Sequence, residues 1–204
     1  IPSHNYLKKV EKKCKEVNAL LILDEIQPGI GRTGKLFAFE HYDVIPDILV
    51  YGKGLGGGFP IGALSSSKEK MEMFQENPIL GHITTFGGHP VIASAALANL
   101  KETLNSGIMT KITEKENLIR KLLKHKLIIE IRGKGLMLAL ILENKKIANQ
   151  LVVKSLEKGL ILFWLLFEGK AVRITPPLTV SDKEIRLGCK TIIDTLDKIN
   201  NTVN

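Results

Sequence analysis

The chain has 204 residues and a net charge of +8, and 44% of its residues are hydrophobic and 25% charged. These proportions are ordinary for a globular protein with one or two domains. The positive charge is mostly lysine scattered over predicted helix faces. It lacks the interleaved aromatic residues on which single-stranded nucleic acids stack, which argues against a nucleic-acid partner.

The sequence also argues against a membrane or metal-binding protein. Its longest apolar run, residues 159–167, is much shorter than the roughly 20 residues that cross a bilayer. Cys14 and Cys189 are far apart and lack metal-type spacing. The first residues have no signal-peptide pattern, so we expect a cytoplasmic protein. The chain begins with Ile1 and enters a helical pattern at once, which suggests a fragment.

Helices and strands alternate in the first half of the chain. Apolar residues at helical spacing predict a helix that Ser3 caps and that ends near residue 17. Short apolar runs at 19–23 and 47–51 predict buried parallel strands. Glycine-rich segments follow both runs, and an alanine-rich stretch predicts a helix over 90–104.

The second half has a different order of elements. Predicted helices cover residues 109–126, 145–158 and 181–199, and predicted strands cover 128–132, 136–142, 160–166 and 171–174. Ser181 and Glu184 form a capping-box pattern at the start of the last helix. We interpret residues 1–105 as the C-terminal part of a large α/β domain and residues 106–204 as a small α+β domain.

Two residues with side chains suited to catalysis lie at the ends of predicted strands. Asp24 follows the first strand and Lys53 follows the second. If the strands are parallel, both residues lie at the carboxyl edge, where open α/β sheets bind ligands. Pyridoxal phosphate (PLP) requires a lysine for its imine and a carboxylate that keeps its pyridine nitrogen protonated. On spacing alone, a turn-capping aspartate and a surface lysine remain alternatives.

Residues 29–34 match two nucleotide-binding patterns only formally. They read G-x-G-x-x-G, but Asp24 to Pro28 separate them from the strand, and no helical pattern follows directly. A P-loop needs Ser or Thr after its lysine, and here Leu36 follows Lys35. We therefore exclude both interpretations.

Longer segments resemble one known family. The segments are residues 23–34, 46–48, 53–63, 84–90, 132–137 and 173–178. In this order, and over essentially the whole chain, they resemble class III PLP-dependent aminotransferases, in particular the acetylornithine and ornithine aminotransferases. The resemblance implies the fold-type I PLP-dependent transferase fold, of which this chain would be the C-terminal half.

The resemblance also implies roles for individual residues. The implied site comprises Asp24 at the pyridine nitrogen, Ile26 on the ring face, Gln27 at the ring hydroxyl, Lys53 in a Schiff base, Thr85 at the phosphate across a dimer interface, and Arg173 at a substrate carboxylate. A guanidinium suits bidentate carboxylate binding, although a structural ion pair is the alternative for Arg173.

The implied activity is ping-pong transamination. An (acetyl)ornithine-like or other ω-amino donor would transfer its amino group to an oxo acid such as 2-oxoglutarate, in a homodimer. Family members are longer than this chain, and the additional half supplies part of their cofactor site. The alternative is therefore an inactive truncated remnant, or a dimerising fragment that lacks a complete cofactor site.

Overall fold

The computed structural model describes residues 1–203, with side chains through residue 201. Its contacts divide the chain into two compact units, which are residues 2–109 and residues 110 onward together with Ile1. Their assignment to a large and a small domain, with a boundary near residue 106, stays a prediction. In the described part of the chain, no helix is both long enough and apolar enough to cross a membrane.

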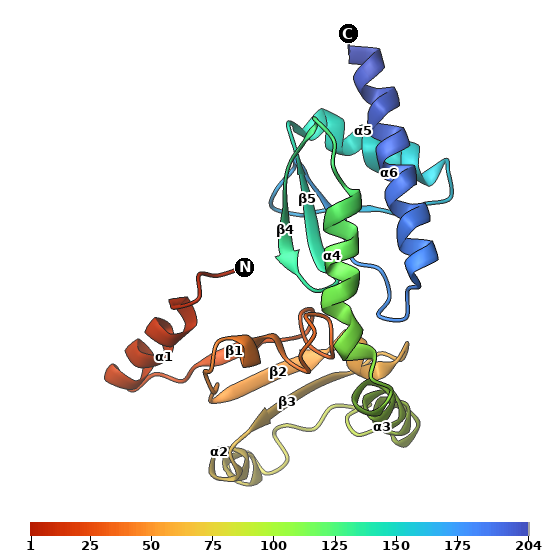
Figure 1. Ribbon diagram of the computed structural model, residues 1–204. Helices are drawn as coiled ribbons and strands as arrows, with labels where there is room; N and C mark the ends of the chain where they lie inside the picture. The colour runs from red at the N-terminus through yellow and green to blue at the C-terminus, as the bar shows by residue number, and fades with distance from the viewer. Residues whose placement is uncertain (204) are drawn as a thin grey trace. The chain divides into compact units, whose positions relative to one another are not determined.

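The first unit contains a three-stranded sheet with helices before and after it (Figure 1). Its elements are α1 (Tyr6–Glu16), β1 (Ile22–Asp24), the 3₁₀ helix η1 (Ala38–His41), β2 (Ile48–Gly52), the 3₁₀ turn η2 (Lys53–Gly56), β3 (Gly62–Ser66), α2 (Lys68–Glu72), η3 (Met73–Gln75) and α3 (Pro90–Asn105). A further 3₁₀ turn, η4 (Ile108–Lys111), follows α3.

The strand order is β1-β2-β3, with β1 parallel and β3 antiparallel to β2. The predicted parallel pairing of the first two strands is confirmed. The expectation that both are buried is wrong for this chain, because Ile22 is 55% exposed and only Gly52 of β2 is buried. Side chains of a sheet are buried by a layer that packs on its face, and among the described residues no α-helix packs extensively on β1 or β2. The first helix begins at Tyr6 after Asn5, and not after Ser3 as predicted.

A small apolar cluster joins the glycine-rich segments of the first unit to α3. It contains Ile30, Leu55 and Ala96, and Leu36, Phe37, Tyr51, Ile61 and Ala63 pack against it. Leu55 belongs to η2 and is 6% exposed, so the turn that follows β2 is anchored by a buried side chain. This anchor determines where the residues after β2 lie.

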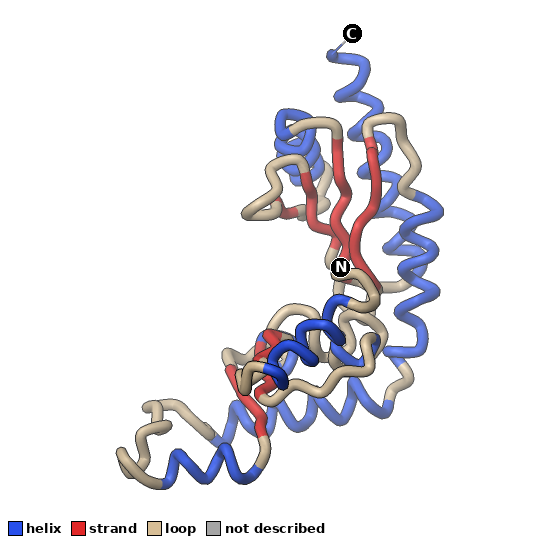
Figure 2. The backbone as a smooth tube through the Cα atoms, turned by 90° about the vertical axis from the view of Figure 1, so that its left-hand side faces the viewer, coloured by secondary structure: helices blue, strands red, loops and turns tan. Residues whose placement is uncertain are grey.

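The second unit is a four-stranded sheet with three helices (Figure 2). Its elements are α4 (Ile112–Leu122), β4 (Ile128–Lys134), β5 (Met137–Leu142), α5 (Lys145–Leu156), β6 (Phe163–Trp164), β7 (Ala171–Ile174) and α6 (Asp182–Val203). The strand order is β4-β5-β7-β6, and all three pairings are antiparallel. Helices α4 and α6 run side by side (Figure 1).

The larger apolar core lies in this second unit. Fully buried residues from the sheet and the helices form it, among them Leu140, Leu151 and Leu196. The predicted capping box is confirmed, because Ser181 N–H donates to Glu184 Oε2 at 2.7 Å and Glu184 N–H donates to Ser181 Oγ at 3.3 Å. The strand predicted over 160–166 is reduced to the two residues of β6.

Candidate active site

Asp24 and Lys53 lie at the carboxyl ends of neighbouring parallel strands, at the same edge of the sheet. Asp24 is the last residue of β1 and lies opposite Val50 of β2, and Lys53 comes directly after β2. Both side chains are exposed. The Ile26 N–H donates to Asp24 Oδ1 at 2.9 Å, which orients this carboxylate at the strand end. The carboxyl edge of the sheet therefore presents an acid and an amine.

Lys53 has a backbone conformation that is unusual for a residue with a side chain. Its φ is +41°, in the left-handed region that glycine adopts easily and other residues rarely do. A β-carbon at the preceding Gly52 would lie 2.8 Å from the carbonyl oxygen of Ile61, so only glycine fits there. Strained conformations of this kind concentrate at functional sites.

The neighbouring Glu25 is buried and binds the backbone at the start of η1. It is 3% exposed, and its carboxylate accepts hydrogen bonds from the Ala38 N–H at 3.0 Å and the Phe39 N–H at 2.8 Å. Burial raises the pKa of Glu25, and the two backbone donors offset part of that effect. Strand β1 ends at Asp24, so the buried Glu25 belongs to the following loop, whereas the carboxylate of Asp24 is exposed.

The other predicted cofactor contacts lie in the same unit. Ile26 and Gln27 are half-buried in the turns that follow β1. Thr85 is exposed in the turns between η3 and α3. The hydrogen bonds of the described residues do not connect Thr85 to Asp24 or Lys53. Asp24, Ile26 and Gln27 are close together because they are near neighbours in the sequence. The parallel pairing of β1 with β2 brings Lys53 to the same edge of the sheet.

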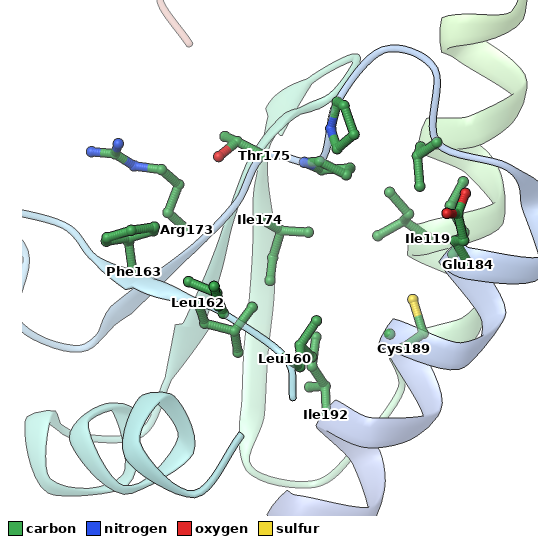
Figure 3. A pocket seen from close by; sticks show the side chains of 16 residues that line it. Ile119, Leu160, Leu162, Phe163, Arg173, Ile174, Thr175, Glu184, Cys189 and Ile192 are labelled. Atoms are coloured by element: carbon green, nitrogen blue, oxygen red, sulfur yellow. The ribbon is translucent and has the colours of Figure 1, made fainter. Parts of the chain in front are cut away.

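Arg173 belongs to the second unit. It lies on β7 between Ala139 of β5 and Phe163 of β6 in the sheet register. Its Nε atom is buried and has no hydrogen-bond partner among the described residues. Figure 3 shows that the guanidinium extends on the side of Phe163, away from the side to which Ile174 points. The arginine thus carries a donor that a carboxylate could satisfy.

A largely apolar cavity of about 440 Å³ lies on the Ile174 side (Figure 3). Side chains from α4, α6, β7 and residues 160–163 line it, including Ile119, Ile174 and Ile192. Cys189 also lines it, and burial raises the pKa of its thiol to about 11. That thiol is therefore protonated at neutral pH and is a poor nucleophile.

Sequence reasoning missed Asn99. Its Nδ2 atom donates to the carbonyl oxygens of Gly54 at 2.6 Å and Leu55 at 3.3 Å, and both belong to η2. The available signal was an isolated asparagine within the alanine-rich pattern of α3.

The donor set at the edge of the first sheet fits PLP. Lys53 offers a primary amine, and among the described residues no ion pair occupies it. Asp24 offers an exposed carboxylate from the adjacent strand. These are the two groups that the cofactor requires from a protein: an amine for its aldehyde and an acid for its ring nitrogen.

Comparisons with known proteins point to the same family. The Aminotransferase class-III family matches residues 1–196. The chain is 42% identical over 199 residues to acetylornithine aminotransferase from Caldanaerobacter subterraneus subsp. tengcongensis, covering 95% of this chain and 49% of that protein. It is 40% identical over 210 residues to putrescine aminotransferase from Pectobacterium atrosepticum, covering 100% and 45%.

A solved structure agrees with these relatives. Ornithine aminotransferase from Toxoplasma gondii, whose structure has PLP in partial occupancy at its active site, superposes with a TM-score of 0.88. It is 32% identical, and the match covers 99% of this chain and 48% of that one. The chain thus spans about half the length of the relatives that it matches. On this similarity of sequence and fold, the chain belongs to the class III aminotransferases.

Proposed function

We propose that this chain is the part of a PLP-dependent aminotransferase that carries the cofactor-binding lysine, Lys53. The observation that carries the proposal is the pairing of Asp24 and Lys53 at the ends of adjacent parallel strands, with Lys53 at a φ of +41°. The chain would correspond to the C-terminal half of its relatives. Intact Asp24 and Lys53 argue against a remnant that has lost its chemistry.

Each residue of the proposed site has a distinct task. Lys53 would attach PLP covalently and, once an amino donor had displaced it, would move a proton at the donor carbon that bears the transferred amino group. Asp24 would pair with the ring nitrogen and keep it protonated. Ile26 would pack on one face of the ring, Gln27 would contact its hydroxyl group, and Thr85 would bind the phosphate of the cofactor in the partner subunit. When bound, PLP supplies the electron sink that weakens bonds at the substrate carbon.

We assign the substrate class from the relatives and from Arg173. The donor is an ω-amino compound such as ornithine or acetylornithine, and the acceptor is an oxo acid such as 2-oxoglutarate. The guanidinium of Arg173, whose Nε has no hydrogen-bond partner among the described residues, supports a role in binding a substrate carboxylate. A diamine donor, which the putrescine aminotransferase relative suggests, is the second candidate, and it has no carboxylate for Arg173 to bind.

We also propose a cytoplasmic homodimer. The family resemblance implies that Thr85 contacts the cofactor phosphate in the partner subunit's site. The exposed position of Thr85 is compatible with a contact outside its own chain. Cys14 and Cys189 are free thiols, as expected for a protein in a reducing compartment.

The test is chemical trapping on the full natural polypeptide that contains this sequence. After incubation with PLP, borohydride reduction should attach a pyridoxyl group to Lys53, as located by peptide mass spectrometry. The Lys53→Ala variant should lose both the trapped group and the visible absorbance of bound cofactor.

Lys35→Ala is the matched control, because Lys35 is an exposed lysine in the other glycine-rich loop of the same unit. It should trap PLP like the wild type. Trapping that persists at other lysines while Lys53 stays unmodified would overturn the assignment.

A further inference from the structure

We infer that Asn99 is a positioning residue for Lys53, and this inference rests on the proposed function of that lysine. Asn99 is half-buried on α3, 46 positions after Lys53 by residue number. It contacts the turn η2, which begins with Lys53. The side chain of Asn99 therefore contacts the short stretch of backbone that begins with Lys53, and so can influence the backbone conformation of Lys53.

The contact consists of hydrogen bonds to consecutive carbonyls. Asn99 Nδ2 lies 2.6 Å from the Gly54 oxygen and 3.3 Å from the Leu55 oxygen. The Gly54 oxygen also accepts from the Gly57 N–H at 3.3 Å, and this bond closes the turn. The amide of Asn99 thus donates to the same acceptor that holds the turn together.

The shape of the turn fits this amide closely. A β-carbon at Gly57, which has a φ of +57°, would lie 3.0 Å from Cβ and 3.2 Å from Cγ of Asn99. Glycine at this position therefore serves two requirements, a left-handed conformation and room for the asparagine.

Asn99 itself is held in place. Its backbone oxygen accepts from Thr103 Oγ1 at 2.9 Å, and Thr103 is 7% exposed. Leu55 of the same turn packs into the cluster of Ile30 and Ala96. A polar contact and an apolar contact therefore fix η2 against α3, and they hold Lys53 in its left-handed conformation.

A residue in this conformation needs such support, because the left-handed region is sterically unfavourable for every residue except glycine. Without Asn99, Lys53 can relax toward negative φ, which turns its side chain away from the strand edge. Lys53 would then reach the aldehyde of the cofactor more rarely, although its own chemistry is unchanged. Misplacement of a reacting group by about 1 Å can slow a reaction on the order of a hundredfold.

The test compares Asn99→Asp with the wild type in the full natural polypeptide. Aspartate keeps the shape of asparagine but replaces its donor with an acceptor facing two carbonyls. Hydrogen exchange at the Gly57 amide should accelerate roughly fivefold to tenfold, which corresponds to the loss of the net stabilisation that one hydrogen bond provides. The rate of borohydride-trappable PLP attachment to Lys53 should fall by roughly tenfold to a hundredfold.

Two further variants separate positioning from stability. Asn117→Asp, the same change at an exposed site on α4, should leave both rates at their wild-type values. Asn99→Ala, which removes the donor without adding an acceptor, should slow attachment when measured well below its own unfolding temperature. A destabilised Asn99→Ala that still traps PLP at the wild-type rate would show a merely structural role and overturn the inference.

The exchange and trapping results also separate this inference from the proposed function. Unchanged exchange at Gly57 in Asn99→Asp overturns the inference even if Lys53 binds PLP normally. Absence of trapping at Lys53 in the wild type overturns the proposed function and the inference together. If exchange at Gly57 were still accelerated in Asn99→Asp while the wild type trapped no PLP, Asn99 would be shown to be a structural contact between α3 and η2 and nothing more.

Discussion

Arg120 Nε donates to Glu116 Oε1 at 2.9 Å, and this pair on α4 binds the turn of the β4–β5 hairpin. The other guanidinium nitrogens of Arg120 donate to the carbonyl oxygens of Ile131 at 2.6 Å and Gly133 at 2.8 Å. Glu116 Oε2 accepts from the Gly135 N–H at 2.6 Å. One ion pair therefore satisfies several backbone groups of a single hairpin.

Replacing Arg120 with lysine should destabilise the protein by about 1–3 kcal/mol, because a single ammonium cannot reproduce these three donor directions. Urea unfolding of the second unit, followed by a probe such as Trp164, measures the effect. Arg186→Lys, at an exposed position on α6, is the control and should change the free energy of unfolding by less than about 0.5 kcal/mol. Equal effects of the two changes would contradict the interpretation.

Two glycines with positive φ should respond differently to alanine. At Gly133, with a φ of +123°, an added β-carbon would lie 2.1 Å from the carbonyl oxygen of Met137. At Gly159, with a φ of +77°, it would meet nothing within 4 Å. We expect Gly133→Ala to cost about 4 kcal/mol or more, and Gly159→Ala about 1–2 kcal/mol. Thermal and urea unfolding of both variants check this order, and a reversed order would refute it.

The buried carboxyl of Glu25 should make stability depend on pH. Burial raises its pKa above the ordinary value of 4.5 in the folded state. The folded protein therefore holds this proton more tightly than the unfolded chain does. Its contribution to stability is fully present below pH 4.5 and is lost as the pH rises through the folded-state pKa.

The measurement is the difference in unfolding free energy between the wild type and Glu25→Gln across this pH range. Glutamine keeps the shape of the side chain and cannot ionise. The wild type should lose stability relative to the variant as the pH rises, and then the difference should level off. A difference that moves in the opposite direction would show that the Ala38 and Phe39 donors outweigh burial.

Arg173→Ala should discriminate between classes of amino donor. If the guanidinium binds a substrate carboxylate, the variant should lose roughly tenfold to a thousandfold in kcat/KM for ornithine or acetylornithine, since a charged hydrogen bond is worth about 1.5–3 kcal/mol and more if a partner is left unpaired. Putrescine, which lacks a carboxylate, should be affected much less. Measuring the half-reaction with the amino donor alone excludes any effect of the substitution on binding of the oxo acid. Equal losses of kcat/KM for both donors would indicate that Arg173 has a structural role.

The elements that could be predicted from sequence are those whose signals are local. The apolar run 171–174 corresponds to β7, and the Ser181–Glu184 pattern starts α6. The strand β3 was not predicted, because Gly62–Ser66 contains no β-branched residue. Its conformation depends on pairing with β2, which the tertiary structure supplies.

The same distinction applies to the candidate site. Asp24 and Lys53 end apolar runs, so their meeting at one sheet edge follows from the expectation of parallel strands, which the structure confirms. The partners of Asn99 lie 45 and 44 positions away in sequence. A periodicity argument says which face of α3 is apolar, but it cannot say which backbone carbonyls a single amide on that helix will meet.

The left-handed backbone of Lys53 implies a conflict between stability and chemistry at one position. Glycine adopts this conformation without steric cost, so a chain under no chemical demand would gain free energy of folding by exchanging the lysine for glycine. Function and folding thus favour different residues at position 53. A search for stabilising substitutions in this protein would select against the proposed cofactor attachment, so position 53 should be held constant in any such design.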